Sequence, residues 1–163
     1  MRYGEMKMTI IDLLDKNAEL YPNETALVEI NPQVTSAKKM TWREYPLMWT
    51  EPGEALRREI TWLDFEKSAN RFANLLLTRG CKKGDKVAVL LMNSLEWLPV
   101  YFGILKAGCV AVPLNYRYTA EEIKYCLEKS DSSALVFGAE FIGRIEEICD
   151  RIPKVKDLFY VGE

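Results

Sequence analysis

The chain has 163 residues, with 22 Lys and Arg against 24 Asp and Glu, no histidine, and a formal net charge of −2. Apolar residues make up 48% of it, which is typical of a soluble globular protein with one sizeable core. The interspersed charges argue against a nucleic-acid partner, and the lack of histidine excludes Ser-His-Asp triads, Cys-His dyads and His-ligated metals.

The first predicted unit, residues 1–30, is a helix and a strand that pack on the main domain. Thr9 and Asp12 have the spacing of a reciprocal N-cap, and apolar residues then recur at helical spacing until Pro22 ends the helix. A short β-like segment covers 25–30. The polar face of the helix mixes both signs of charge, which favours core packing over binding to an anionic membrane.

Residues 31–56 are an irregular insertion rich in aromatic residues and proline. Trp42, Tyr45 and Trp49 stand out in it. Aromatic residues are enriched at interfaces. The segment is therefore a β-hairpin with a long loop, a partner-binding surface or a flap over a substrate, and the sequence leaves these alternatives open.

Residues 57–163 alternate strand-like and helix-like segments, which predicts an α/β subdomain. Strands joined by helical crossovers run parallel, with right-handed connections. The predicted fold class is α/β, a doubly wound, mostly parallel sheet with helices on both faces. Five strands are expected, at 58–60, 86–92, 109–114, 133–137 and 158–161.

The ends of these helices carry recognisable signals. Cap residues followed three positions later by an acid occur at Thr61 and Asp64, at Asn93 and Glu96, and at Thr119 and Glu122. Pro99 lies inside the second of these helices and predicts a kink or a later start. We interpret Lys106 as a cation over the last helix carbonyls, and Gly80 and Gly108 as left-handed stops.

Four cysteines, at 81, 109, 126 and 149, are too far apart in sequence for a C-x-x-C motif. We therefore predict neither a zinc ribbon nor a thioredoxin-type site. Most of them fall in apolar patterns and are interpreted as buried structural thiols, which fits a reducing, cytoplasmic compartment. The chain has no segment with the features of a signal peptide or a transmembrane span.

Ligand sites of parallel α/β sheets lie beyond the carboxyl ends of the strands. The loops to search therefore follow Met92, Pro113, Phe137 and Val161. They contain neither a glycine-rich phosphate loop nor a carboxylate cluster for a metal ion. We predict no catalytic, cofactor-binding or metal-binding residue in this chain.

Asn115, Tyr116 and Arg117 lie just past the carboxyl end of a predicted strand. They are the candidates for a substrate-facing loop. A plain turn is the alternative interpretation.

Two segments resemble core motifs of adenylate-forming enzymes. Residues 104–115, ILKAGCVAVPLN, are similar to the second core motif, L-K-A-G-x-x-x-x-P-[LI]. Residues 60–65 resemble the first core motif, with Trp62 in place of the usual Tyr and Phe65 in place of the usual Leu.

Two further segments extend this resemblance. Residues 84–97, GDKVAVLLMNSLEW, are similar to a strand followed by an Asn-initiated helix in the family. Residues 115–122, NYRYTAEE, are similar to the next segment of acyl-CoA synthetases. The resemblance covers residues 58–163, and residues 9–30 fit the family's N-terminal helix and strand.

The resemblance implies a ligase that uses ATP and Mg²⁺ to convert a carboxylic acid, here a fatty acid, into an acyl-adenylate, which then reacts with CoA. The family's phosphate loop, nucleotide-binding residues and catalytic lysine all follow the matched region. We therefore expect a truncated N-terminal fragment that is an inactive scaffold. Its expected partners are the remaining domains of the parent enzyme, which would bind the acid, ATP and CoA. A homodimer is an open alternative, because a cut fragment exposes apolar surface.

A second hypothesis is a stand-alone α/β interaction module. It would dock a partner through the aromatic segment 42–49. A self-sufficient module is expected to be a stable monomer, whereas a fragment is expected to bury its exposed apolar surface against another chain.

Overall fold

The computed structural model describes residues 8–30, 38–42, 45–49 and 57–162. Its helices are α1 (Ile10–Leu20), α2 (Trp62–Thr78), α3 (Trp97–Lys106), α4 (Ala120–Ser130) and α5 (Ile142–Ile148), and the 3-10 turns η1 (Ala139–Phe141) and η2 (Cys149–Arg151) flank α5. Its strands are β1 (Thr25–Ile30), β2 (Lys38–Trp42), β3 (Tyr45–Trp49), β4 (Arg57–Thr61), β5 (Lys86–Leu90), β6 (Val110–Pro113), β7 (Ser132–Gly138) and β8 (Asp157–Val161).

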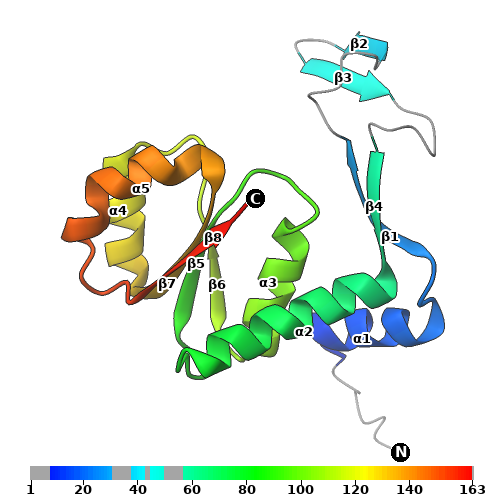
Figure 1. Cartoon of the computed structure of the whole chain (residues 1–163), viewed down its shortest axis with the longest axis horizontal. Helices are drawn as coiled ribbons and strands as arrows, with labels where there is room; N and C mark the ends of the chain where they lie inside the picture. The colour runs from blue at the N-terminus through cyan, green and yellow to red at the C-terminus, as the bar shows by residue number, and fades with distance from the viewer. Residues whose placement is uncertain (1–7, 31–37, 43–44, 50–56, 163) are drawn as a thin grey trace, which may run out of the picture.

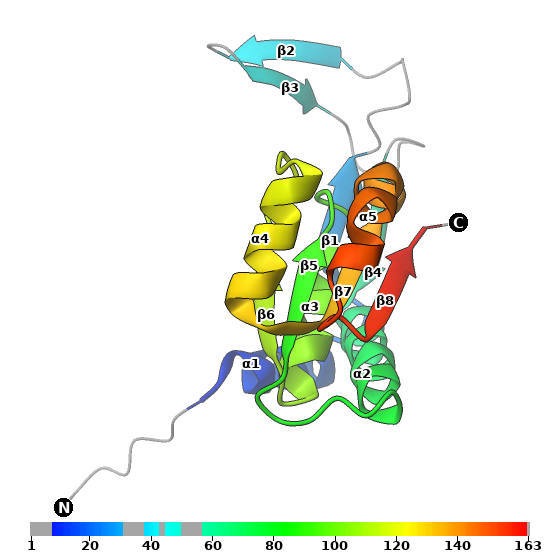
Figure 2. The ribbon, with the colours of Figure 1, turned by 90° about the vertical axis from the view of Figure 1, so that its left-hand side faces the viewer.

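The centre of the fold is a four-stranded sheet in the order β6-β5-β7-β8, with every neighbouring pair parallel (Figure 1). Val87 and Val89 of β5 pack in a cluster with α2 and α3. Ala88 and Leu90 pack on the other face with α4 and α5, which lie in front of the strands in Figure 2. The alternation confirms the predicted α/β fold with helices on both faces.

The expected first strand of this sheet belongs elsewhere. β4 pairs antiparallel with β1 in a separate two-stranded sheet, so the prediction of a fifth parallel strand was wrong. The physical reason is its composition, since Arg57, Arg58 and Glu59 cannot be buried on both faces as a central strand requires. The hydroxyl of Thr25 on β1 donates to Glu59 at 2.6 Å, and this bond, with Arg57, lowers the pKa of Glu59.

β2 and β3 form an antiparallel hairpin in which Trp42 pairs with Tyr45 and Lys38 with Trp49. The expected hairpin is therefore present in this part of the insertion, while the partner-binding surface and the substrate flap stay predictions. Residues 31–37, 43–44 and 50–56, together with the hairpin side chains, lie outside what the structure describes.

The predicted helix caps at Thr9 and Thr119 are confirmed. Each hydroxyl accepts from the backbone N–H three residues on, and the carboxylates of Asp12 and Glu122 accept from the cap's backbone N–H in return. These returned hydrogen bonds lower the pKa of both carboxyls. Thr61 also caps α2: its hydroxyl accepts from the Asp64 N–H at 3.1 Å and donates to the Asp64 carboxylate at 2.9 Å.

The predicted cap at Asn93 was wrong, because α3 begins only at Trp97 and its N-cap, Glu96, makes no side-chain cap bond. The later start places Pro99 in the first turn of the helix. A proline is tolerated there, since the first-turn N–H groups have no partner within the helix. Of the two outcomes expected from Pro99, the later start is the one found.

Lys106 does not cover the last carbonyls of α3, contrary to our interpretation. Its ammonium group lies 2.5 Å from Asp15 of α1 and 3.2 Å from Glu66 of α2, and it donates to Asn70 at 2.7 Å. The side chain is 11% exposed. Lys106 therefore joins three helices, while Gly108, with a φ of 76°, is the left-handed stop expected.

Helices α2 and α3 approach closely at Gly103. A Cβ there would lie 2.8 Å from the carbonyl oxygen of Ala69 and 3.0 Å from the Cβ of Phe72. The helices could not keep this separation with a larger residue.

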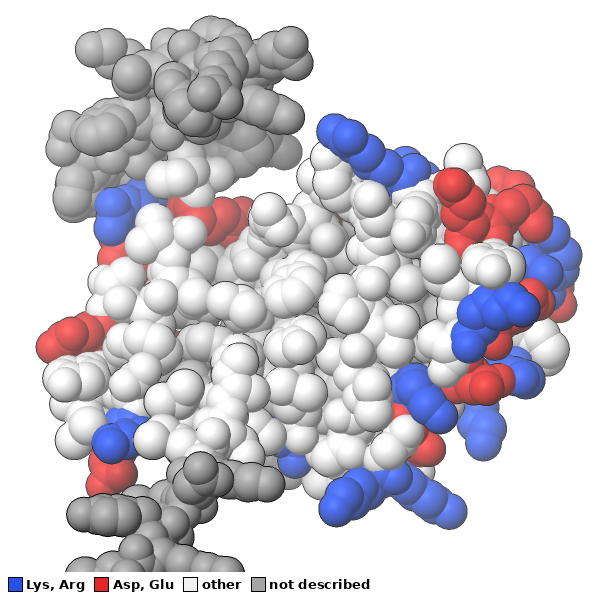
Figure 3. Space-filling view, turned by 180° about the vertical axis from the view of Figure 1, so that it is seen from behind, with Lys and Arg blue, Asp and Glu red and all other residues white. Residues whose placement is uncertain are grey.

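The charged residues have no single-sign concentration on the face seen in Figure 3. Blue and red atoms alternate around the end that carries α4 and α5, and the middle of the described surface is largely uncharged. Within the described residues, no helix combines the length and the apolar content that a membrane crossing requires.

We expect Lys106→Met to lower the free energy of unfolding by about 1–3 kcal/mol, because it leaves Glu66 and Asp15 without their shared cation. Urea denaturation measures this. The matched control is Lys154→Met, whose ion pair with Asp131 is exposed and should matter little. Equal effects of the two substitutions would contradict the role given to Lys106.

Gly103→Ala should destabilise the protein by about 1–3 kcal/mol, because the new methyl group overlaps α2. This reverses the usual gain of roughly 1 kcal/mol when Ala replaces Gly in a helix. Gly143→Ala on α5 is the control, since a Cβ there meets nothing within 4 Å. Thermal unfolding of both variants decides the matter, and a Gly103→Ala protein as stable as the control would refute the close approach.

Candidate functional site

The neighbouring strands β5 and β7 send their connections to opposite faces of the sheet. After β5 the chain enters α3, which packs with α2 on one face, and after β7 it enters α5, which packs with α4 on the other. The carboxyl ends of β5 and β7 therefore form a topological switch point, where open α/β sheets bind ligands.

A crevice of about 570 Å³ lies at this edge of the sheet. The loops after β5, β7 and β8 line it, together with Arg58 of β4. Its other lining residues are Leu91, Met92, Ser94, Glu96, Gly138, Ala139, Glu140, Tyr160, Val161 and Gly162. Three of the four loops singled out from the sequence thus meet here, and the loop after Pro113 is not among the lining segments.

Two glycines at strand ends give the crevice its shape. A Cβ at Gly138 would collide with the carboxylate of Glu140, and one at Gly162 would collide with the hydroxyl of Tyr160. The Glu140 carboxylate and the Tyr160 hydroxyl therefore lie directly over these two glycines.

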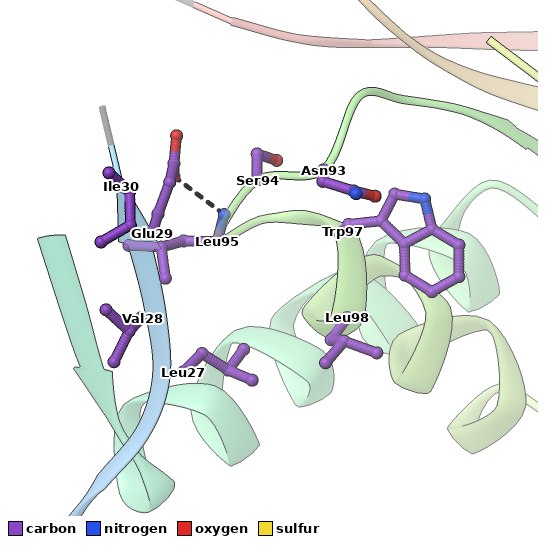
Figure 4. Close-up of a pocket in the computed structure, with 9 residues that line it drawn as sticks. All are labelled: Leu27, Val28, Glu29, Ile30, Asn93, Ser94, Leu95, Trp97 and Leu98. Atoms are coloured by element: carbon purple, nitrogen blue, oxygen red, sulfur yellow. Dashed lines mark hydrogen bonds between the residues drawn. The ribbon is translucent and has the colours of Figure 1, made fainter. Parts of the chain in front are cut away.

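Ion pairs connect the charged residues of the crevice with the β1–β4 sheet. The guanidinium of Arg58 lies 2.6 Å from Glu29 and 3.6 Å from Glu96. The same Glu29 oxygen accepts the backbone N–H of Leu95 at 3.0 Å, as the dashed line in Figure 4 shows. Glu29 therefore fastens the loop after β5 to strand β1.

A second pocket, of about 370 Å³, lies beside the hydrogen bond between Glu29 and Leu95, between β1 and the start of α3. Its lining is largely apolar, and Leu27 of β1 points toward Leu98 of α3, whereas Val28 lies on the other side of the strand (Figure 4). Ser94 lines both this pocket and the crevice. Movement of the loop that carries Ser94 would change both spaces together.

The described lining residues of the crevice include neither histidine nor cysteine. In the described part of the chain no three or more Cys, Asp or Glu side chains gather as a metal site would require. Arg58, the cation of the crevice, is already engaged by carboxylates. We assign no catalytic residue to it.

Asn115, Tyr116 and Arg117 lie together in an exposed, internally bonded turn. The Asn115 side chain accepts the Arg117 N–H at 3.0 Å, and the Arg117 guanidinium lies 5.3 Å from the centre of the Tyr116 ring. Arg144 of α5 donates to the carbonyl of Tyr116 at 2.7 Å and also to that of Tyr118. This geometry agrees with a plain turn, and contact with a substrate stays a prediction.

Sequence reasoning missed two residues that hold loops in place. Glu29 bonds to the loop after β5, and Arg144 bonds to the turn that contains Tyr116. Glu29 had a signal, because it is the one acidic residue inside the apolar segment TALVEI, 25–30. Arg144 had none, since its acceptors are main-chain carbonyls that only the fold brings near.

A family model described as "AMP-binding enzyme" matches residues 14–160. Among curated proteins, a medium/long-chain-fatty-acid–CoA/3-oxocholest-4-en-26-oate–CoA ligase of Mycolicibacterium smegmatis is 37% identical over 105 residues, 64% of this chain and 19% of the relative. The long-chain-fatty-acid–CoA ligase FadD13 of Mycobacterium tuberculosis is 38% identical over 91 residues, 56% of this chain and 18% of the relative. The chain thus spans about a fifth of these relatives.

The N-terminal domain of FACL13 from Mycobacterium tuberculosis, solved with an inhibitor, superposes with a TM-score of 0.74 at 27% identity. The match covers 94% of this chain and 33% of that domain. A long-chain-fatty-acid–CoA ligase of Archaeoglobus fulgidus superposes with a TM-score of 0.76 over 100% of this chain and 29% of its own, at an identity of 21% that speaks for the fold alone.

We expect Glu29→Ala to speed hydrogen exchange at the Leu95 amide by about tenfold or more, because a hydrogen bond to a charged group contributes roughly 1.5–3 kcal/mol. Glu29→Gln keeps an acceptor oxygen and should have a smaller effect. Glu19→Ala, an exposed acid on α1, is the control. Unchanged exchange at Leu95 in Glu29→Ala would show that the loop is held by other contacts.

Proposed function

Because the chain belongs to the AMP-binding enzyme family, we propose that it is the N-terminal scaffold of an acid–CoA ligase that acts on fatty acids. It resembles the N-terminal region of fatty acyl-CoA ligases in sequence and in fold. The relatives named as medium- and long-chain-fatty-acid–CoA ligases support a fatty acid as the substrate.

The scaffold role is supported by one observation: the residues that resemble the family's second core motif have structural roles in this fold. The segment 104–115 runs from the end of α3 through β6, and each of its distinctive residues has a structural task. Lys106 joins three helices, Gly108 adopts the left-handed stop, and Pro113 ends an edge strand where its missing N–H costs little.

The proposed reaction begins from a carboxylate, which is a poor electrophile until its oxygen is attached to a good leaving group. ATP supplies that leaving group as AMP, and the thiol of CoA then displaces it. The described lining of the carboxyl-edge crevice does not fit a triphosphate, because Glu96 and Glu140 would repel its negative charge and Arg58 is already paired with carboxylates. Nor do the described residues gather the three acidic side chains that would mark a site for Mg²⁺. We derive no step of adenylation from this chain.

The stand-alone interaction module is not favoured. The family match extends over residues 14–160, and the two relatives named above are fatty-acid–CoA ligases. We place the protein in the cytoplasm, a proposal supported by four free cysteines. Dimerisation stays a prediction.

The test is pyrophosphate release with Mg²⁺-ATP and a panel of medium- and long-chain fatty acids. It is run on the protein as the cell makes it and, in parallel, on residues 1–163 alone. We expect release, followed by acyl-CoA formation, from the protein as the cell makes it. We expect none from the isolated chain, because the groups that stabilise phosphoryl-transfer charge are not in its described part.

Two results would count against the proposal. Pyrophosphate release by residues 1–163 would contradict the scaffold role. No release with any fatty acid by the protein as the cell makes it would contradict the fatty-acid–CoA ligase assignment.

A further inference from the structure

Helices α2 and α3 end in the same motif, each with a cysteine at the same position. Gly80 and Gly108 adopt φ values of 86° and 76°, and a cysteine follows each of them. The N–H of Cys81 and that of Cys109 each bond to the carbonyl five residues back, at 3.0 Å. These are Schellman motifs, which hold the backbone of both cysteines in matched, well-defined conformations.

The sheet places the two motifs side by side. β5 and β6 are parallel neighbours, so the turns that enter them meet at the amino edge of the sheet. The N–H of Gly84 donates to the carbonyl of Gly108 at 2.9 Å, and that of Val110 donates to the carbonyl of Asp85 at 2.8 Å. The sulfur of Cys109 lies 3.5 Å from the carbonyl oxygen of Lys82, the residue after Cys81.

The two thiols share one environment but differ in access. Cys109 is buried, with 5% of its surface exposed, and Cys81 packs partly buried against the same apolar cluster. Burial is the main cause that raises the pKa of both thiols, and each interacts with the other. The nearby carboxylates of Asp85 and Asp157 raise the pKa of Cys81 further.

We propose that Cys81 and Cys109 form a redox modification site, a dithiol that a peroxide oxidises to an intrachain disulfide. The partly exposed Cys81 thiolate attacks one oxygen of hydrogen peroxide and becomes a sulfenic acid, and the other oxygen leaves as water after taking up a proton. The Cys109 sulfur then attacks the Cys81 sulfur and expels hydroxide, which takes the Cys109 proton.

This sequence balances. Two thiols and one peroxide give one disulfide and two waters, so the sulfurs lose two electrons and the peroxide oxygens gain them. Because the attacking species is a thiolate and burial raises both pKa values, the reaction is slow at neutral pH. It accelerates as the pH rises towards those pKa values.

The chain contains its own control thiols. Cys126 lies on α4 and the exposed Cys149 lies in η2, both on the opposite face of the sheet from α2 and α3. Cys149 is the most accessible of the four thiols. If exposure alone decided reactivity, peroxide would oxidise Cys149 first.

The experiment treats the 163-residue chain with hydrogen peroxide, blocks the remaining thiols with iodoacetamide, and maps tryptic peptides by mass spectrometry without reduction. We expect a linked pair of peptides, 80–82 and 107–117, and alkylation of Cys126 and Cys149. The yield of the linked pair at a fixed time should increase as the pH is raised above neutrality.

Cys81→Ser and Cys109→Ser should each abolish the linked pair, whereas Cys149→Ser should leave its yield unchanged. The primary result comes from the unmodified sequence, so it does not depend on whether a serine variant folds. Oxidation confined to Cys149, bridges that involve Cys126 or Cys149, or alkylation of all four thiols after peroxide treatment would overturn the proposal.

Discussion

The burial of β5 and β7 on both faces is the constraint on which the rest of the structure depends. Residues 87–90 and 134–136 are at most 1% exposed. A strand that is apolar on both faces needs helices on both faces, and right-handed crossovers then decide on which side each helix lies. The opposite exits of β5 and β7 follow from this arrangement, and so does the crevice between their carboxyl ends.

The same constraint gives the two edges of the sheet different characters. At the carboxyl edge, three loops and Arg58 surround an open space, and Glu29 fixes one of those loops to β1. At the amino edge, two helix ends and two turns are closely bonded around a pair of thiols.

The features that followed from local pattern were predictable from the sequence. Continuous apolar segments located β5 and β7, and Thr-x-x-acid spacing located the caps of α1, α2 and α4. The features that depend on long-range pairing were not. β4 has a strand-like sequence, but that sequence does not specify which strand it pairs with. Lys106 has the sequence position of a helix-end cation, and only the packing of α1 and α2 against α3 shows that it pairs with Asp15 and Glu66. The thiol pair needed knowledge that β5 and β6 are neighbours, although the two Gly-Cys dipeptides at helix ends were visible in the sequence.

We propose that this chain is the scaffold of an adenylate-forming enzyme and that its described residues hold no nucleotide site. Calorimetric titration of the chain with Mg²⁺-ATP tests it most directly, with CoA and a fatty acid titrated in turn. We expect no saturable heat of binding for Mg²⁺-ATP. Saturable, stoichiometric binding would contradict it, because the nucleotide site would then lie within these 163 residues.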